Sequence, residues 1–336
     1  MRIHFSVGLV LAALTCSAAA SAQEPAKSAD GPAPSAAEPA KDAGAAPTGP
    51  TPAVKKAGYA LPYAMRPAIA PNLARIDANY LALKGSTAFS SLLTGGYKPI
   101  ASIPDLGFYA RAGVVGTSMD GLPGSGTAVT NPLFFALYTP EIAPKVRLPI
   151  FAGVTAPIGS GGGNSPDPKV RNALATGIYA RQAMDNALFA TNYLTPTVGA
   201  GIAFIDKGLT VQAEVTVLQL MRVRGDKIDG DKSRTNFTSG VNVGYLVLPP
   251  HLTISAELHY QRWLSTPKAV EADEARPADV RLGLRDQLTV GGGLRANIPL
   301  DAKILMRPGI AYFRGLDDPM AKNRYSIIQI DVPIAF

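Results

Sequence analysis

The last twelve residues of the chain, 325–336, read YSIIQIDVPIAF. Apolar residues occupy every second position: Ile328, Ile330, Val332, Ile334 and Phe336. The positions between them include the polar residues Tyr325, Gln329 and Asp331. Because successive side chains of a strand point to opposite faces, this stretch predicts a β-strand with one apolar face and one polar face.

The same period of two continues upstream as far as Leu73. Turn residues divide this part of the chain into twelve segments: 74–83, 89–98, 106–115, 132–138, 146–156, 194–205, 209–221, 234–247, 252–263, 286–297, 302–313 and 325–336. Most have about the 9–11 residues that a tilted strand needs to cross a bilayer. The pattern predicts an all-β fold, a transmembrane antiparallel up-and-down β-barrel of about twelve strands.

The connections between these segments alternate in length. Even-numbered segments end in short turns such as DKG and LPPH, and most odd-numbered segments end in long polar loops such as RGDKIDGDKS. The short KGSTA after the first segment is the weak case. Short turns at one end and long loops at the other are typical of bacterial outer-membrane barrels.

Aromatic residues close the even-numbered segments on the outward-facing parity: Tyr97, Tyr138, Phe204, Tyr245 and Phe336. Amphipathic rings are favoured at a membrane interface, so these five predict a girdle at the short-turn end. Near the other end of the strands, the alternation predicts that the side chains of Tyr325 and Trp263 point into the barrel.

The N-terminus has a basic head, an apolar run from Phe5 to Leu14, and small residues ending in Ala20-Ser21-Ala22. This order predicts a secretory signal peptide over 1–22, cleaved before Gln23. An uncleaved anchor is disfavoured because the apolar run is shorter than the roughly 20 residues of a spanning helix. Cys16 raises a lipoprotein alternative, which the preceding Thr15 disfavours.

The next stretch, 23–60, consists mostly of Ala, Pro, Gly and Lys and is predicted to be a disordered linker. The barrel is assigned to 61–336. The whole chain is 47% hydrophobic and only 17% charged, without a later apolar run long enough for a spanning helix. Its net charge of +7 is spread along the chain rather than clustered, so nucleic acid is not an expected partner.

The C-terminal pattern resembles the terminal strand of Gram-negative outer-membrane β-barrel proteins, although Ile334 stands where that family often has an aromatic residue. The resemblance implies an outer-membrane location, lipid as surroundings, and Phe336 as a signal for the barrel assembly machinery. A weaker resemblance, based on the strand number and on Asn131-Pro132 at a strand start, is to outer-membrane channels of aromatic-compound degradation and fatty-acid transport. The competing fold class is a secreted β-sandwich.

Charged residues on the inward parity should line the lumen, because a charge facing hydrocarbon costs a few kcal/mol. The candidate lining residues are Asp77, Arg111, Arg147, Glu214, Glu257, His259, Arg295, Arg307 and Asp331. Such a lining is compatible with a narrow polar channel and equally with a bore closed by its own ion pairs.

The longest connection, 160–192, contains Asp167-Pro168 followed by apolar residues at helical spacing. An Asp N-cap and a Pro in the first turn predict a helix there. Two placements are open, inside the barrel or as an external lid, and the lid is favoured.

The expected function is a channel or transporter for small solutes, hydrophobic ones included. The alternative is a non-conducting structural or adhesion barrel. Neither a nucleophile–base pair nor a metal-ligand motif is recognisable, so no enzyme activity, metal or cofactor is expected.

Deleting Phe336 should impair membrane insertion far more than it destabilises the finished barrel, because burial of one rim side chain contributes only about 1.5–3 kcal/mol. Deleting 23–56 should leave insertion largely intact, because that segment lacks the apolar content to join a core. Surface-protease accessibility of cells compares the two deletions. Normal insertion without Phe336 would contradict its role as an assembly signal.

Overall fold

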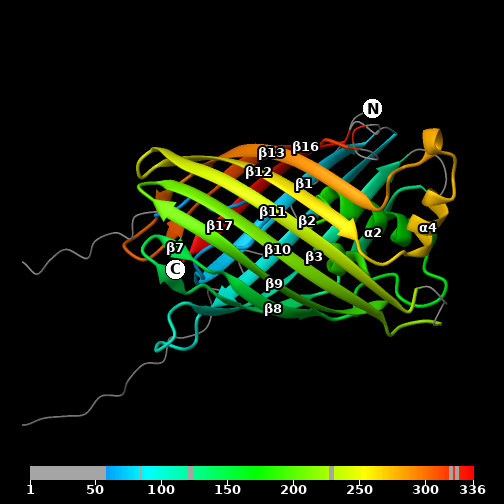
Figure 1. Cartoon of the computed structure of the whole chain (residues 1–336), viewed down its shortest axis with the longest axis horizontal. Coiled ribbons are helices and arrows are strands. Elements are labelled where there is room, and N and C mark those ends of the chain that lie inside the picture. Colours follow the sequence, from blue (N-terminus) through cyan, green and yellow to red (C-terminus); the bar gives the residue numbers. More distant parts are fainter. Residues whose placement is uncertain (1–57, 84, 120–123, 227–230, 318–320, 322–324) are drawn as a thin grey trace, which may run out of the picture. The chain divides into compact units, whose positions relative to one another are not determined.

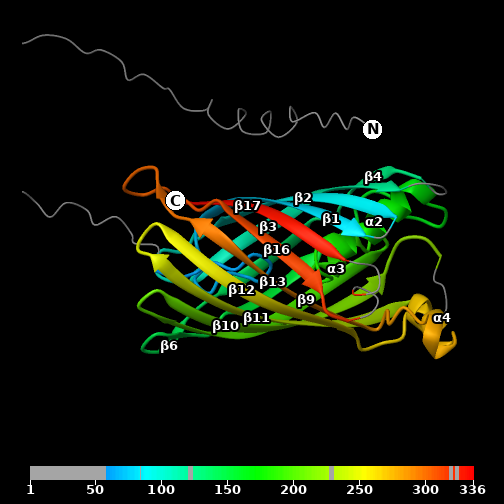
Figure 2. The same ribbon diagram turned by 90° about the horizontal axis from the view of Figure 1, so that it is seen from above.

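The computed structural model describes residues 58–336 except 84, 120–123, 227–230, 318–320 and 322–324. The expected signal peptide, 1–22, and the linker up to residue 57 lie outside the described residues. The predicted fold is confirmed: the chain forms a closed antiparallel β-barrel (Figures 1 and 2).

Twelve strands form the wall, and several of them are interrupted, which gives seventeen segments in the described part of the chain. The segments are β1 (Leu73–Leu83), β2 (Ser86–Tyr97), β3 (Leu106–Met119), β4 (Gly126–Val129), β5 (Leu133–Tyr138), β6 (Glu141–Ala143), β7 (Val146–Arg147), β8 (Ile150–Thr155), β9 (Tyr193–Asp206), β10 (Leu209–Arg222), β11 (Ser233–Leu248), β12 (Leu252–Trp263), β13 (Asp286–Ala296), β14 (Ile298–Pro299), β15 (Leu305–Met306), β16 (Gly309–Gly315) and β17 (Ser326–Ala335). Each of the twelve predicted segments overlaps one strand of this wall.

Closure is made by the two terminal strands. β1 pairs with β2 on one side and with β17 on the other, in a register that runs from Leu73 opposite Ala335 to Ala82 opposite Ser326. This pairing closes the barrel that the sequence predicted. Among the described residues, the pairing of β1 with β17 joins the two terminal strands and closes the sheet on itself, as a β-sheet that spans a membrane requires.

The helices are α2 (Pro168–Ala180), α3 (Asn186–Phe189), α4 (Lys268–Glu274) and a 3-10 turn, η1 (Ala278–Val280). At the start of α2, Asp167 accepts a hydrogen bond from the backbone N–H of Lys169 at 2.8 Å. The predicted N-cap is thus confirmed. In the described ranges, no helix has the length and apolar content of a membrane-crossing helix.

The two ends of the barrel differ as predicted. The short connections and the C-terminus lie at one end, called here the turn end, and α4 extends from the opposite, loop end (Figure 1). The five predicted girdle residues, Tyr97, Tyr138, Phe204, Tyr245 and Phe336, are all between 39% and 59% exposed. Tyr325 is buried in the lumen, as its parity predicted.

Alternation along each strand separates an apolar outer face from a polar lumen. On β10, Val211, Val215 and Val217 are exposed, while Gln212 and Glu214 between them are buried. On β17, the isoleucines 328 and 330 point outward in the same way. The outer face therefore presents a band that suits lipid rather than water.

The loop between β12 and β13 is ordered by one carboxylate at the loop end. Asp273 accepts hydrogen bonds from the backbone N–H groups of Leu282 (2.7 Å) and Leu284 (3.1 Å). Burial raises the pKa of Asp273, but these backbone donors outweigh it, so its pKa lies below the usual value. The contribution of this carboxylate to loop stability is present above its ordinary pKa and is lost as the pH falls through the lowered value.

Replacing Val241, which faces outward in the middle of β11, by Arg should cost roughly 2–4 kcal/mol in a bilayer. The matched control is Val280→Arg in η1, where a valine of similar exposure (52% against 42%) lies in the loop region. The control should change stability by less than about 0.5 kcal/mol. Reversible unfolding in phospholipid vesicles measures both, and equal losses would contradict a lipid-facing band.

Candidate functional site

The stretch 58–72, which precedes the first strand, folds into the lumen and is called here the plug segment. Six of its apolar side chains are almost fully buried: Ala60, Leu61, Tyr63, Met65, Ala68 and Ala70. Both ends of the plug segment lie at the turn end of the barrel. The backbone N–H groups of Ala60 and Ala70 donate to the hydroxyls of Thr210 and Thr139, and these threonines lie at the turn-end limits of β10 and β5. Its tip, around Met65 and Arg66, reaches mid-depth. Residues 58–60, assigned to the linker from sequence, belong to this ordered segment.

Two glycines on the lumen face of β11 make room for the plug segment. A Cβ built on Gly244 would lie 2.3 Å from the Ala60 Cβ, and one on Gly240 would lie 2.9 Å from the Met65 sulfur. Real Cβ atoms do not approach neighbours so closely. The wall is therefore shaped around the plug segment at these two positions.

Side chains of the wall satisfy the backbone of the plug segment, which forms no regular structure. Glu257 accepts hydrogen bonds from the N–H groups of Tyr63 (2.5 Å) and Ala64 (3.2 Å), and Gln212 donates to the carbonyl of Arg66 (2.8 Å). His259 also contacts Glu257, at 2.8 Å. Backbone groups buried in this way need partners, and the wall supplies them.

The tip of the plug segment is held by Arg66. Its Nη1 lies 2.6 Å from the Glu214 carboxylate, and its guanidinium carbon lies 3.6 Å from the centroid of the Phe151 ring. A guanidinium stacked on an aromatic face and paired with a carboxylate is a favourable arrangement away from water.

Closer to the seam between β1 and β17, Asp331 lies between two arginines. Arg75 binds it at 2.8 Å and Arg295 at 2.5 Å. Arg75 also donates to the carbonyl of Tyr63 at 2.5 Å, and the Arg295 guanidinium lies 4.4 Å from the Tyr63 ring centroid. Arg307 donates to the carbonyl of Tyr59 at 2.6 Å. These charges of the wall thus also bind the plug segment.

The 160–192 loop enters the lumen from the opposite end, so the preferred prediction of an external lid is wrong. Its tip joins the wall through a ring of four charges: Asp77 of β1 and Arg111 of β3 with Arg181 and Asp185 of the loop. The four ion pairs measure 2.7–3.1 Å. Because Asp77 and Arg111 are largely buried, each needs an oppositely charged partner in the lumen. Arg181 and Asp185 of the loop are these partners.

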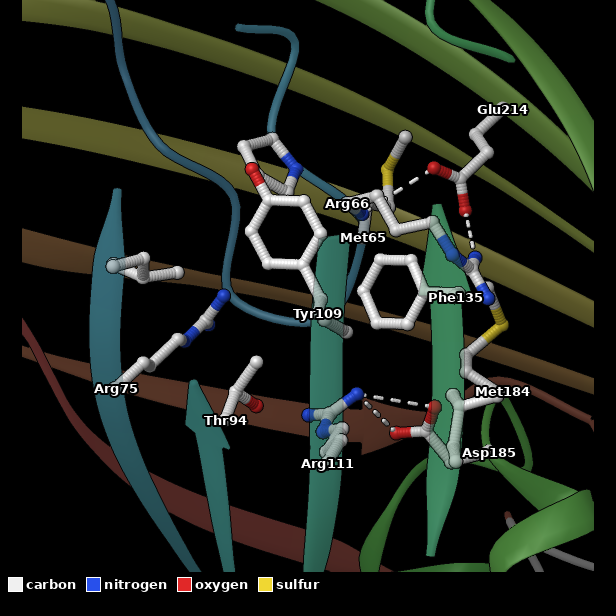
Figure 3. Close-up of a pocket in the computed structure, with 14 residues that line it drawn as sticks. Met65, Arg66, Arg75, Thr94, Tyr109, Arg111, Phe135, Met184, Asp185 and Glu214 are labelled. Atoms are coloured by element: carbon white, nitrogen blue, oxygen red, sulfur yellow. Dashed lines mark hydrogen bonds and ion pairs between the residues drawn. The ribbon is translucent and has the colours of Figure 1, made fainter. Parts of the chain in front are cut away.

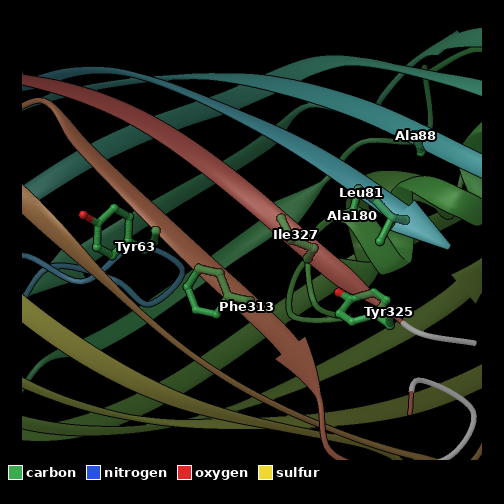
Figure 4. Packing of buried hydrophobic residues seen from close by; sticks show 8 residues of the cluster. Tyr63, Leu81, Ala88, Ala180, Phe313, Tyr325 and Ile327 are labelled. Carbon is green, nitrogen blue, oxygen red and sulfur yellow. The ribbon is translucent and has the colours of Figure 1, made fainter. Parts of the chain in front are cut away.

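Apolar contacts also fix this loop. Ala173 and Leu174 of α2 and Phe189 of α3 pack in one cluster with Leu92 and Val115 of the wall. A second cluster contains Ala180 at the end of α2 and reaches Tyr63 of the plug segment through Phe313, Ile327 and Tyr325 (Figure 4).

Asn131, singled out above with Pro132, lies between β4 and β5 and anchors the same loop. Its amide oxygen accepts from the N–H of Gly159 at 2.9 Å, and its amide nitrogen donates to the carbonyl of Ala190 at 2.9 Å. The Asn131-Pro132 pair thus interrupts the strand where the inserted loop is attached.

Between the two tips lies a cavity of about 40 Å³ (Figure 3). Residues of both inserted segments and of the wall line it, chiefly Met65, Arg66, Arg75, Tyr109, Arg111, Phe135, Met184, Asp185 and Glu214. Figure 3 shows Arg111 reaching Asp185 across the lower side and Arg66 reaching Glu214 across the upper side. The cavity is the place where a solute in the lumen would meet both segments.

The nine residues predicted to line the lumen fall into two groups. Eight have buried or largely buried side chains beside an inserted segment: Asp77, Arg111, Glu214, Glu257, His259, Arg295, Arg307 and Asp331. Arg147 is apart from them at the turn end, where it binds Asp105 at 2.9 Å and Glu141 at 3.4 Å. It fixes the β6–β7 hairpin rather than lining the cavity.

Several buried polar atoms on the lumen wall have no hydrogen-bond partner among the residues that the structure describes. They include atoms of Thr197, Gln212, Asn242, His259 and Gln329. Buried polar atoms without a protein partner are normally bound to water. This lining therefore favours water or a polar solute. Among the described residues, no group of acidic, His or Cys side chains is arranged to hold a metal ion.

Sequence reasoning missed Arg66, Arg181 and Asp185, which come from the two inserted segments. A signal was present for the first of these: GYALPYAMRPAIAP, at 58–71, contains two tyrosines, a leucine and a methionine directly after a stretch without large apolar residues. Such a change of composition indicates that the chain has begun to bury side chains.

The comparisons with known proteins give a similarity of fold at low sequence identity. No protein-family model matches the sequence, and no curated protein matches it. The fold is similar to an outer membrane channel from Pseudomonas putida F1 (TM-score 0.49, 12% identity, 82% of this chain and 98% of that one). It is also similar to KdgM porin (0.41, 11%, 78% and 99%) and to the translocator domain of the autotransporter NalP from Neisseria meningitidis (0.42, 10%, 79% and 86%). Since these three TM-scores are below 0.5, the activities of these proteins are not transferred to this chain.

Replacing Asp185 by Asn should leave Arg111 and Arg181 short of a buried anionic partner and cost about 3 kcal/mol. Amide hydrogen exchange over 168–189 should become faster. In the control, Asp206→Asn, the acid pairs among the described residues with the exposed Lys145 at the turn end, so the loss should stay below about 1 kcal/mol. Unchanged exchange in the Asp185 variant would show that the ion-pair ring does not hold the loop.

Proposed function

We propose that this protein is an outer-membrane barrel that conducts small polar solutes when the plug segment leaves the lumen. The observation that carries the proposal is the meeting of two inserted segments at mid-depth, both held by side-chain contacts rather than by strand pairing. Neither segment belongs to the hydrogen-bonded sheet, so either can move without breaking the pairing of the wall.

The apolar outer band supports a location in lipid, and the long-loop end corresponds to the outside of the cell in barrels of this architecture. The assembly machinery and membrane lipid are the partners that this location implies. A cleaved signal peptide over 1–22 would deliver the chain there.

The lumen supports a polar solute rather than a hydrophobic one. Arginines, carboxylates and unpaired amides line it, and a hydrophobic molecule passing them would strip their hydration without replacing it. The wall is hydrogen-bonded all round, so the bore can open by movement of its contents alone.

The second candidate is a barrel that stays shut, with a structural or adhesive role. One observation favours it: Asp331, Asp77 and Asp185 are each bound to two arginines. These ion pairs would keep the bore closed, and a barrel that stays closed does not conduct a solute.

Planar-bilayer conductance separates the two candidates. Deleting 58–71 should raise single-channel conductance several-fold over the full chain, because the plug segment fills the lumen from the turn end to mid-depth. Deleting 165–189 as well should raise it further. A silent double deletion that retains the heat-modifiable migration of a folded barrel would favour the shut barrel.

A disulfide lock is the matched control for movement. A Cβ at position 240 would lie 3.0 Å from the Met65 Cγ, so Met65→Cys with Gly240→Cys, in a chain with Cys16→Ser, places two thiols within bonding reach. The oxidised protein should show no openings, and reduction should restore those of the full chain. Equal activity in both states would refute opening by withdrawal of the plug segment.

A further inference from the structure

Three arginines from three different elements line the cavity between the tips. Arg66 comes from the plug segment, Arg75 from β1 and Arg111 from β3. Two carboxylates line the same cavity, and each is hydrogen-bonded to one of these arginines: Asp185 to Arg111 and Glu214 to Arg66. The cavity lining therefore has one more positive than negative group.

The arginines retain hydrogen-bond donors that no protein group uses. Arg66 donates through Nη1, Arg75 through Nε and Nη2, and Arg111 through Nη1 and Nη2. Within the described residues, Arg66 Nε and Nη2, Arg75 Nη1 and Arg111 Nε have no hydrogen-bond acceptor, and Arg111 Nε is fully buried.

The carboxylates, in contrast, have their oxygens engaged. Both oxygens of Asp185 accept from Arg111, and Oδ2 accepts from Arg181 as well. Both oxygens of Glu214 accept from Arg66, one from the side chain and one from the backbone N–H at 3.3 Å. The cavity thus offers unused donors and few unused acceptors, which suits an acceptor-rich occupant.

One side of the cavity is apolar. Tyr109 and Phe135 stack with ring centroids 5.0 Å apart and planes at 17°, and Met65 and Met184 close the space beside them. An occupant therefore meets cationic N–H groups on one side and rings and thioethers on the other.

We propose that this cavity binds a small carboxylate, with its oxygens on Arg66, Arg75 and Arg111 and its alkyl part against Phe135 and Met184. This inference rests on the proposed function, a barrel that conducts small polar solutes, and it names carboxylates as the class of solute. Guanidinium groups bind carboxylates with strong, directional hydrogen bonds. A cavity of about 40 Å³ has room for about three waters at roughly 10–15 Å³ each, a space close to that of acetate.

Binding of acetate and acetamide to the purified full-length protein tests the proposal by equilibrium dialysis at neutral pH. The two molecules have the same shape, and only acetate is an anion. Acetate should bind at least about tenfold more tightly, because a hydrogen bond to a charged group contributes more than one to a neutral group. Nitrate, which has the charge without the methyl group, should bind more weakly than acetate.

Two variants locate the site. Arg111→Gln should weaken acetate binding about tenfold or more, whereas Arg222→Gln should not change it, because Arg222 also has a buried, unpaired Nε but does not line this cavity. If Arg111→Gln fails to fold, Met184→Phe fills the cavity without removing charge and should abolish binding.

Equal binding of acetate and acetamide, equal binding of acetate and nitrate, or full binding by Met184→Phe would each overturn the carboxylate site. These results are independent of the conductance measured after deletion of the plug segment. A barrel that conducts without binding acetate would refute this inference alone, and one that binds acetate but never conducts would refute the conduit alone.

Discussion

The constraint on which the rest of this structure depends is that no backbone group of the wall can face hydrocarbon unpaired. Pairing of β1 with β17 meets it by closing the sheet. Closure then divides the side chains into two sets, because alternate residues of every strand point outward or inward. The apolar set forms the outer band, and the polar set is enclosed in a narrow space where each charge needs a partner.

The enclosed charges explain how the lumen is filled. Asp77, Arg111, Glu214, Glu257 and Asp331 each lie four or five residues from the turn-side end of their strand, and all five point into the lumen. Isolated buried charges are costly, whereas paired and hydrogen-bonded ones are tolerated. The plug segment brings Arg66 to these wall charges from the turn end of the barrel. The 160–192 loop brings Arg181 and Asp185 to them from the loop end.

Most of the wall could be predicted from the sequence, and most of its contents could not. The period of two, the alternating connection lengths and the terminal Phe336 are local signals, and they predicted twelve strands and their closure. The plug segment has no hydrophobic periodicity. Its contact between Tyr63 and Glu257 joins residues 194 positions apart, and no local sequence pattern predicts such a contact. For the 160–192 loop, Asp167 predicted a helix, but the choice between lid and insertion depends on Asp77 and Arg111, which lie in other strands.

The course of the plug segment has a consequence for the order of assembly. Both ends of the plug segment, at Ala60 and at Ala70, lie at the turn end of the barrel. The 160–192 loop connects β8 to β9 and enters the lumen from the loop end. Neither segment is threaded through the closed ring. The seam can therefore form first and each insert can enter afterwards, so an error in filling the barrel can be corrected without reopening its wall.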